Sequence, residues 1–340
     1  MEKLKKILSK IKYYRVICIS LVLVLALISL VLKIILGIQT ARYTDQTMAS
    51  RWDSNNKYSH ISLFIKDSAN VDGNSISELE YNINKQLEIN NVDNENENGR
   101  KFIDSYMAKD QMNLESDRKS VSVKCMAVGG DFFDFHPVKL LSGQYFSGND
   151  LMHDGVILDE ETAWELFGSS DVADQQIYWE GKLLYVRGVY ERGGDHITEY
   201  ARGDEPEIFV PYELLCSEDY SPSIVCIEIC MPNPVENFAS KIVTDVFKVD
   251  TNSFEMVENS TRFTVEKLWK INKEKKYRSM QNRDIIFPYW EKIARYQEER
   301  LAPVAVWMMI CIIAAGTIFV CFALYEISIH TRLKPTRDDV

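Results

Sequence analysis

Histidine is scarce in this sequence, and its cysteines follow no metal-binding pattern. The 340 residues include five histidines and seven cysteines. The histidines are scattered along the chain, so they predict no zinc site. The sequence also lacks a G-x-x-x-x-G-K-[ST] loop, a G-x-S-x-G turn and an H-E-x-x-H helix, and so has no P-loop for ATP. We therefore predict a protein that is not an enzyme, with no catalytic residues, no bound metal and no cofactor.

Two long apolar runs stand out against this background, at residues 16–38 and 304–325. Each has about 22 residues, enough for a helix to cross a hydrocarbon core of about 30 Å. The first run contains one charge, Lys33, close enough to its end for the amine to reach the headgroups. A cleaved signal peptide would have a shorter apolar stretch and an A-x-A site. We predict transmembrane helices at residues 16–38 and 303–325.

Basic residues next to these runs predict the orientation of the chain. Both tails carry mostly lysine and arginine, and such loops stay on the cytoplasmic side. We therefore expect a two-pass cell-membrane protein with both termini cytoplasmic, residues 326–340 as a tail and residues 39–302 outside the cytoplasm. Residues 1–15 have the pattern of a basic amphipathic helix on the inner leaflet. The candidate residues there for contact with a partner or with lipid are Lys5, Lys6, Lys10, Lys12 and Arg15.

The outer segment is acidic. Residues 39–302 hold 46 of the 50 acidic residues and 29 of the 39 basic ones, a net charge of −17. A surface of this charge repels nucleic acid, so we predict no nucleic-acid partner. An outer location permits disulfides, but Cys226 and Cys230 lie too far apart on a predicted strand to bridge each other. We expect most of the four outer cysteines to be free, namely Cys125, Cys216, Cys226 and Cys230.

The spacing of apolar residues predicts an α+β fold for this outer segment. Residues 60–66 alternate as a strand does, and residues 76–89 have helical spacing with Ser75 as the expected cap. The pattern returns as a strand at 224–230, a helix at 234–247 and a strand at 254–257. We predict a split β-α-β subdomain with a β-rich insertion, then stalk helices. The expected ranges are 59–100 and 206–260 for the subdomain, 101–205 for the insertion and 261–302 for the stalk; residues 90–100 form a loop.

Residues 139–190 carry a more specific pattern. A glycine, two aromatics and an acid precede a predicted strand, which ends in two acids and a helix closing with Leu-Phe-Gly, followed by a glycine-led hairpin. Adjacent acids on a strand face opposite ways, so Asp159 and Glu160 are poor candidates for acid–base chemistry. We expect Phe146, Leu166 and Phe167 to close one small core. The motif residues are Gly143, Tyr145, Phe146, Asp150, Asp159, Glu160, Ala163, Leu166, Phe167, Gly168, Gly181 and Gly188.

This order of residues resembles the periplasmic core domain of MacB-like (macrolide-exporter-type, FtsX-like) ABC transporter permeases. The resemblance implies an α+β extracytoplasmic domain between transmembrane helices. It also implies a separate ABC ATPase subunit and other permease chains as partners, beside membrane lipids. Segments 258–263 and 287–301 also look like parts of two-span, permease-like proteins from low-GC Gram-positive bacteria. Family permeases have four spans where two are predicted here, and the chain ends about 15 residues after the second.

Two functions follow from this resemblance. The first is a non-catalytic membrane subunit of a MacB-like ABC transporter system, which couples the outer domain to a separate ATPase. The alternative is a stand-alone extracytoplasmic sensor or adaptor in envelope stress or peptide resistance. A neighbouring ATPase gene favours the first function, and a kinase or anti-sigma gene favours the second.

Overall fold

The structure is a computed structural model that describes residues 2–52, 58–92, 100–148, 150–274 and 284–333, with residues 2–12 and 330–333 described by their backbone alone. The chain divides into two units. A helical unit holds residues 1–42, 264–277 and 297–340, and a mixed α/β unit holds residues 43–263 and 278–296.

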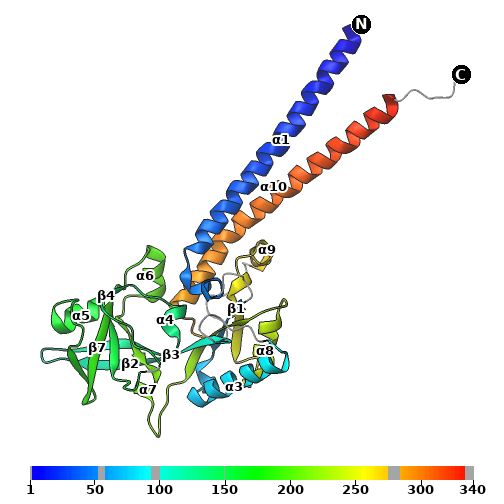
Figure 1. Cartoon of the computed structure of the whole chain (residues 1–340). Helices are drawn as coiled ribbons and strands as arrows, with labels where there is room; N and C mark the ends of the chain where they lie inside the picture. Colours follow the sequence, from blue (N-terminus) through cyan, green and yellow to red (C-terminus); the bar gives the residue numbers. More distant parts are fainter. Residues whose placement is uncertain (1, 53–57, 93–99, 149, 275–283, 334–340) are drawn as a thin grey trace. The chain divides into compact units, whose positions relative to one another are not determined.

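The helical unit contains α1 (Glu2–Ala41), α9 (Val265–Glu274) and most of α10 (Tyr289–Leu333), which begins in the α/β unit. Arg15 donates hydrogen bonds of 2.6 and 2.7 Å to Glu326, so α1 and α10 lie side by side (Figure 1). Both helices are long and apolar enough to cross a membrane, and only 11% of each apolar window is buried. Such exposed apolar surface is what lipid would cover. The helix expected at residues 1–15 is the first part of α1, which continues into the apolar run without a break.

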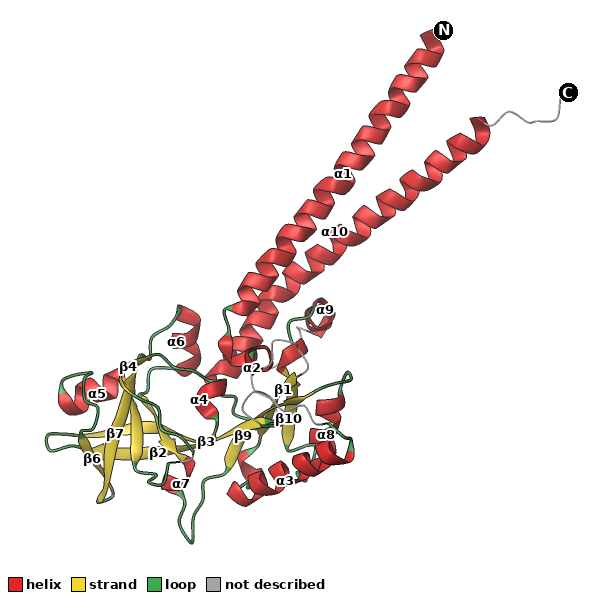
Figure 2. Cartoon of the chain, in the orientation of Figure 1, coloured by secondary structure: helices red, strands yellow, loops and turns green. Residues whose placement is uncertain are grey.

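The first half of the α/β unit is an antiparallel sheet with helices packed on one face (Figure 2). Its strand order is β10-β1-β9-β2, and α3 and α8 contact each other. These elements are β1 (Tyr58–Ile65), β2 (Ile103–Glu115), β9 (Ile224–Pro232), β10 (Phe254–Glu258), α3 (Gly73–Ile89) and α8 (Phe238–Val246).

Helix α3 shows how sequence produces this packing. Ile76, Leu79, Ile83 and Leu87 recur at helical spacing and are all buried against the sheet. The helix begins one turn earlier than expected. Asp72 is its N-cap and accepts a 2.9 Å hydrogen bond from the backbone N–H of Ser75, so the prediction that Ser75 caps the helix was wrong.

The second half of the α/β unit is a six-stranded barrel. Strands pair in the circle β2-β3-β8-β5-β7-β6, and one pair, Glu115 with Tyr178, returns the circle to β2. Strand β4 (Leu140–Gly143) pairs with the second half of β7. The other strands are β3 (Ser120–Gly130), β5 (Gly155–Asp159), β6 (Gln176–Trp179), β7 (Lys182–Tyr190) and β8 (Glu207–Pro211).

Short helices connect the strands of the α/β unit. The 3-10 helix η1 and α2 precede β1, while η2 and η3 follow β1 and β10. Their bounds are η1 (Thr44–Gln46), α2 (Met48–Trp52), η2 (Asp67–Ala69), α4 (Phe132–Phe135), α5 (Glu160–Phe167), α6 (His196–Arg202), α7 (Tyr212–Leu215) and η3 (Asn259–Thr261).

The halves are less separate than the sequence suggested. Strand β8 pairs with β3 and β5, so the expected boundary at residue 206 cuts a barrel strand away from its partners. Strand β2 pairs with β9 at one end and closes the barrel at the other. The helix expected at 234–247 begins only at Phe238. Most of the loop expected at 90–100 lies outside the described residues.

Candidate functional site

A buried polar network lies on the face of β1 and β9 opposite α3 and α8. Along β1, the apolar Ile61 and Leu63 alternate with His60 and Ser62, because successive side chains of a strand point to opposite faces. Strand β9 places Glu228 opposite Ser62 in the register. We call this set the junction network, because its member Asp45 follows shortly after α1 in the sequence. The members are Asp45, His60, Ser62, His136, Glu228 and Asn259.

Glu228 is the centre of the junction network. Its carboxylate accepts a 2.5 Å hydrogen bond from Ser62 and pairs with His60 at 3.2 Å. The Nε2 of His136 contacts its other oxygen, and the Nδ1 of His136 pairs with Asp45 at 3.0 Å. Glu228 and both histidines are buried. Trp290, from the start of α10, stacks on His136 with ring centroids 3.9 Å apart.

The charges of this network support one another. Burial alone would raise the pKa of Glu228, but the charge of His136 and hydrogen bonds from both histidines hold it well below its usual range. Burial alone would lower the pKa of His136, but the charge of Glu228 and hydrogen bonds with Asp45 and Glu228 raise it to about 9. Glu228 is therefore ionised and His136 protonated near neutral pH.

A second buried group, which we call the arginine cluster, holds the start of α10. Glu291 accepts hydrogen bonds of 2.6 and 2.9 Å from Arg262 and one of 2.6 Å from Arg295. Arg295 also donates to Glu255 of β10 at 2.5 Å. Each guanidinium thus has a carboxylate partner, as a buried charge requires. The members of the arginine cluster are Glu255, Arg262, Glu291 and Arg295.

Asn259 joins the two groups. Its side-chain amide donates to Ser62 at 2.7 Å, and its side-chain oxygen accepts from Arg262 at 3.2 Å. A continuous set of buried and partly buried hydrogen bonds therefore runs from Asp45, just after α1, through β1 and β9 to the first turn of α10. Such a network can hold the segment after α1, the strands β1 and β9, and the start of α10 in one geometry.

The pattern at residues 139–190 has a structural role. Gly143, Gly168 and Gly181 have φ of 76, 74 and 79°, which only glycine adopts without strain. A Cβ on Gly143 would lie 2.1 Å from the carbonyl oxygen of Arg187, and one on Gly188 would meet the carbonyl oxygen of Gln144 at 3.0 Å. Gly143 and Gly188 allow β4 and β7 to approach each other, and Gly181 allows the β6–β7 hairpin to turn. Gly168 ends α5.

The acids and the helix of the motif also serve the fold. Asp159 is buried and caps α5, accepting 2.8 Å from Thr162, and its second oxygen accepts 3.0 Å from the backbone of Glu207. Glu160 opens α5, while Asp150 accepts 3.1 Å from the backbone of Ser147. None of these carboxylates faces another at a distance suited to acid–base work.

The expected small core of aromatic residues is divided between two cores. Leu166 and Ala163 are buried in the core below α5, and Phe167 packs against it. Phe146 lies instead in the core that includes Phe132 and Trp290, so its predicted place was wrong. Tyr145 stacks on Phe133 with centroids 4.5 Å apart and donates its hydroxyl to the carbonyl of Val138.

Other predicted residues lie apart from the junction network. Arg15 pairs with Glu326, and the side chains of Lys5, Lys6, Lys10 and Lys12 lie outside the described part of the chain. None of the cysteines that the structure describes forms a disulfide. In the described ranges, no group of three His, Cys, Asp or Glu side chains is placed to hold a metal ion.

Sequence reasoning missed both polar groups. The scattered histidines gave no metal pattern, and their pairing through Glu228 joins residues far apart in the chain. One signal was present: Glu228 is the single charge in the strand IVCIEIC, where every side chain is buried. A lone acid in a fully buried strand indicates a buried partner.

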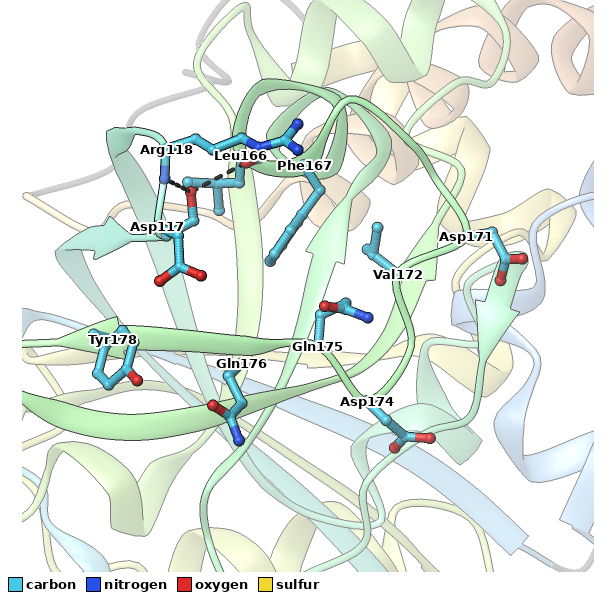
Figure 3. Close-up of a pocket in the computed structure, with 11 residues that line it drawn as sticks. Asp117, Arg118, Leu166, Phe167, Asp171, Val172, Asp174, Gln175, Gln176 and Tyr178 are labelled. Atoms are coloured by element: carbon cyan, nitrogen blue, oxygen red, sulfur yellow. Dashed lines mark hydrogen bonds between the residues drawn. The ribbon is translucent and has the colours of Figure 1, made fainter.

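A cavity of 610 Å³ opens beside α5 in the barrel (Figure 3). In Figure 3, the ring of Phe167 points into the space that Gln175 and Val172 border. Ser116 holds one wall by donating 3.1 Å to the carbonyl of Leu166. The charged side chains of the wall are Asp117, Arg118, Asp171 and Asp174. These side chains make the cavity polar, and the described residues of its wall include no buried group that identifies a particular ligand.

Comparison with protein families gives a match to the MacB-like periplasmic core domain over residues 18–236. Two solved structures are distantly similar. The periplasmic region of MacB from Actinobacillus actinomycetemcomitans is 16% identical, with a TM-score of 0.44, 65% of this chain covered and 94% of that one. The extracellular domain of the noncanonic ABC-type transporter YknZ from Gram-positive bacteria is 14% identical, with a TM-score of 0.38 and coverage of 58% and 99%. Comparison with curated proteins finds no match.

Proposed function

Because its match spans residues 18–236, the chain belongs to the family of MacB-like periplasmic core domains, and we propose that it is a non-catalytic membrane subunit of a MacB-like ABC transporter system. The family is of the permease type, whose members are generally transport components. In this proposal the subunit couples an extracytoplasmic domain to an ATPase on a separate chain and to partner permease chains.

The proposed topology is two-pass, with both termini in the cytoplasm and the α/β unit outside. Two apolar terminal helices flank a domain of periplasmic type. Basic residues at both ends of the sequence support the orientation. Lys5, Lys6, Lys10 and Lys12 would then meet the inner leaflet or a cytoplasmic partner.

The observation that carries the coupling is the junction network and the arginine cluster, which Asn259 joins in the α/β unit. Asp45 follows α1 by four residues and is held through His136 and Glu228. Glu291 belongs to the first turn of α10 and is held by Arg262 and Arg295. Movement of either membrane helix would therefore pull on β1 and β9 through short, charge-assisted hydrogen bonds. The α/β unit would respond as a body, because its core is close-packed.

Co-purification tests the proposed assembly. The tagged full chain is extracted from native membranes in mild detergent, and its partners are identified by mass spectrometry. An ABC ATPase and a second permease chain are expected in amounts comparable to the tagged chain. A matched preparation carries Glu218→Gln, an exposed surface change that should retain the same partners. Absence of any ATPase would contradict the proposal, and a kinase or anti-sigma factor in its place would indicate a sensor.

Labelling of intact cells tests the topology separately. A cysteine at Tyr200, which is 85% exposed on the α/β unit, should react with a membrane-impermeant thiol reagent. A cysteine at Thr336, in the C-terminal tail, should react only after the membrane is broken. The reverse pattern would overturn the orientation without affecting the family assignment.

A further inference from the structure

A second cavity, of 540 Å³, lies in the α/β unit between the barrel and the start of α10. It is of the size that holds a small organic ligand. Its wall is part apolar, from Met126, Ile286 and the ring of Tyr289, and part charged. The charged side chains of the wall are Lys109, Asp110, Lys124, Arg202, Glu207 and Lys292.

The wall carries more positive than negative charge. Four of these side chains are basic and two are acidic. Asp110 is already engaged, since it accepts a 2.9 Å hydrogen bond from the hydroxyl of Tyr220. Glu207 is largely enclosed, and burial raises the pKa of its carboxyl, although the charges of Arg202 and Lys109 act in the opposite direction. The excess of basic over acidic side chains suits the cavity to an anionic ligand.

Arg202 is the best-placed of the cations. Its guanidinium lies 4.0 Å from the ring centroid of Tyr289 and 5.3 Å from that of Tyr190, so aromatic faces hold it in place. Its Nε and Nη1 atoms are buried and have no hydrogen-bond acceptor among the residues that the structure describes. Buried donors usually have acceptors, and leaving them unpaired is costly. An oxyanion entering beside Tyr289 would supply the missing acceptors, and Arg presents its donors in a fork that fits phosphate.

Three lysines surround the same space. The pKa of Lys109 is lowered to about 8 by desolvation of its amine and by the charges of Lys292 and Lys124. The charge of Glu207 acts in the opposite direction. Lys124 pairs with Glu205 at 2.7 Å, and Lys292 makes a long contact of 3.5 Å to the carbonyl of Ala201. Mutual repulsion of these amines would be relieved by a bound anion.

We propose that this cavity binds a small phosphorylated molecule, its phosphate held by Arg202, Lys109 and Lys292 and its organic part against Ile286, Met126 and Tyr289. The shared chemistry is the phosphate group, which a soluble phosphate ester, a free phosphate ion or a lipid headgroup can present. The site does not depend on the proposed transport function, because all its residues lie within the α/β unit.

Isothermal titration calorimetry on the full chain, in a phosphate-free non-ionic detergent, tests the site. The probes are phenyl phosphate, inorganic phosphate and mixed micelles containing phosphatidylglycerol. Saturable binding of phenyl phosphate is expected, and it should weaken as salt is added. Stronger binding of phenyl phosphate than of inorganic phosphate assigns part of the affinity to the apolar wall, equal binding assigns the site to the free ion, and stronger binding of the micelles assigns it to a lipid headgroup.

Matched variants locate the binding. Arg202→Gln and Lys292→Gln should each weaken phenyl phosphate binding roughly tenfold to a hundredfold, because each removes one charge-assisted hydrogen bond. Arg202→Lys, which keeps the charge, should lose less. The control Lys248→Gln removes an exposed lysine of the same unit and should bind as the unchanged chain does. Circular dichroism checks that each variant is folded. Absence of binding by all three probes, or equal binding by folded Arg202→Gln, would overturn the proposal.

Discussion

The two faces of the sheet formed by β1 and β9 are both buried, but by different chemistry. On one face Ile61, Leu63, Ile227 and Ile229 pack against α3 and α8. On the other, His60, Ser62 and Glu228 form the junction network. Burying apolar side chains stabilises the fold in proportion to area, whereas burying charges costs desolvation that their pairing only partly offsets. The apolar face therefore accounts for stability, and the polar face for the fixed position of the segments joined to α1 and α10.

Removing the charge of Glu228, at the centre of the junction network, should change the stability of the chain the most. Glu228→Gln keeps the shape of the side chain but leaves His136 and Asp45 with an incomplete network. We expect the free energy of unfolding to fall by about 3–5 kcal/mol, the usual cost of breaking a buried ion pair. Chemical denaturation of the full chain in mild detergent, followed by tryptophan fluorescence, measures it. The exposed control Glu218→Gln should change little, and an equal loss in both variants would contradict the role of the network.

The apolar face should respond through packing alone. Leu87 of α3 is fully buried, so Leu87→Ala leaves a cavity and should cost about 2–5 kcal/mol. Ile89→Ala, two residues further and 61% exposed, is the matched control and should cost well under 1 kcal/mol. Under the proposed function the two variants should differ further: at temperatures where both stay folded, Leu87→Ala should retain coupling to the partner chains and Glu228→Gln should lose it.

The polar face should make the stability of the chain depend on pH. The pKa of His136 is raised to about 9 from 6.5, so its contribution is complete below pH 6.5 and is lost as pH rises through 9. The pKa of Glu228 is lowered, so its contribution is present above its ordinary pKa of 4.5 and is lost as pH falls below it. The joint contribution of these two groups should be largest between about pH 4.5 and 6.5, and the part due to His136 should fall by about 3 kcal/mol by pH 9. Denaturation midpoints across this range measure the curve, and His136→Gln should flatten its alkaline side.

The smallest effect is expected at the start of α3. Asp72→Ala removes the side chain that accepts hydrogen bonds from the backbone and the hydroxyl of Ser75. A lost N-cap costs about 1 kcal/mol, and Asp72→Asn should retain most of the stability. Thermal unfolding of both variants gives the difference. A loss as large as that of Leu87→Ala would mean that α3 depends on its cap more than on its buried face.

Local signals made much of the fold predictable. Helix α3, helix α5 with its closing glycine, the β6–β7 hairpin and the two apolar helices each follow from neighbouring residues. Closure of the barrel through Glu115 and Tyr178 does not, because it depends on a pairing between distant segments. The junction network was hidden for the same reason: His60, His136 and Glu228 belong to separate elements, and nothing near any one of them identifies the others. Phe146 was misplaced because an apolar residue in a loop can turn toward either core.

Strand β2 ties together the sheet and the barrel, and this has a consequence for how the chain tolerates change. Its first residues pair with β9, residues 105–115 pair with β3, and its last residue meets β6. A strand that is shared in this way cannot shift its register against one neighbour and keep its register with another. Deleting a single residue from its middle would turn every following side chain to the opposite face. Between Met107 and Ala108 the ladder with β9 skips Val225, while the ladder with β3 continues without a break, so β9 takes up the irregularity and β2 keeps its register with the barrel.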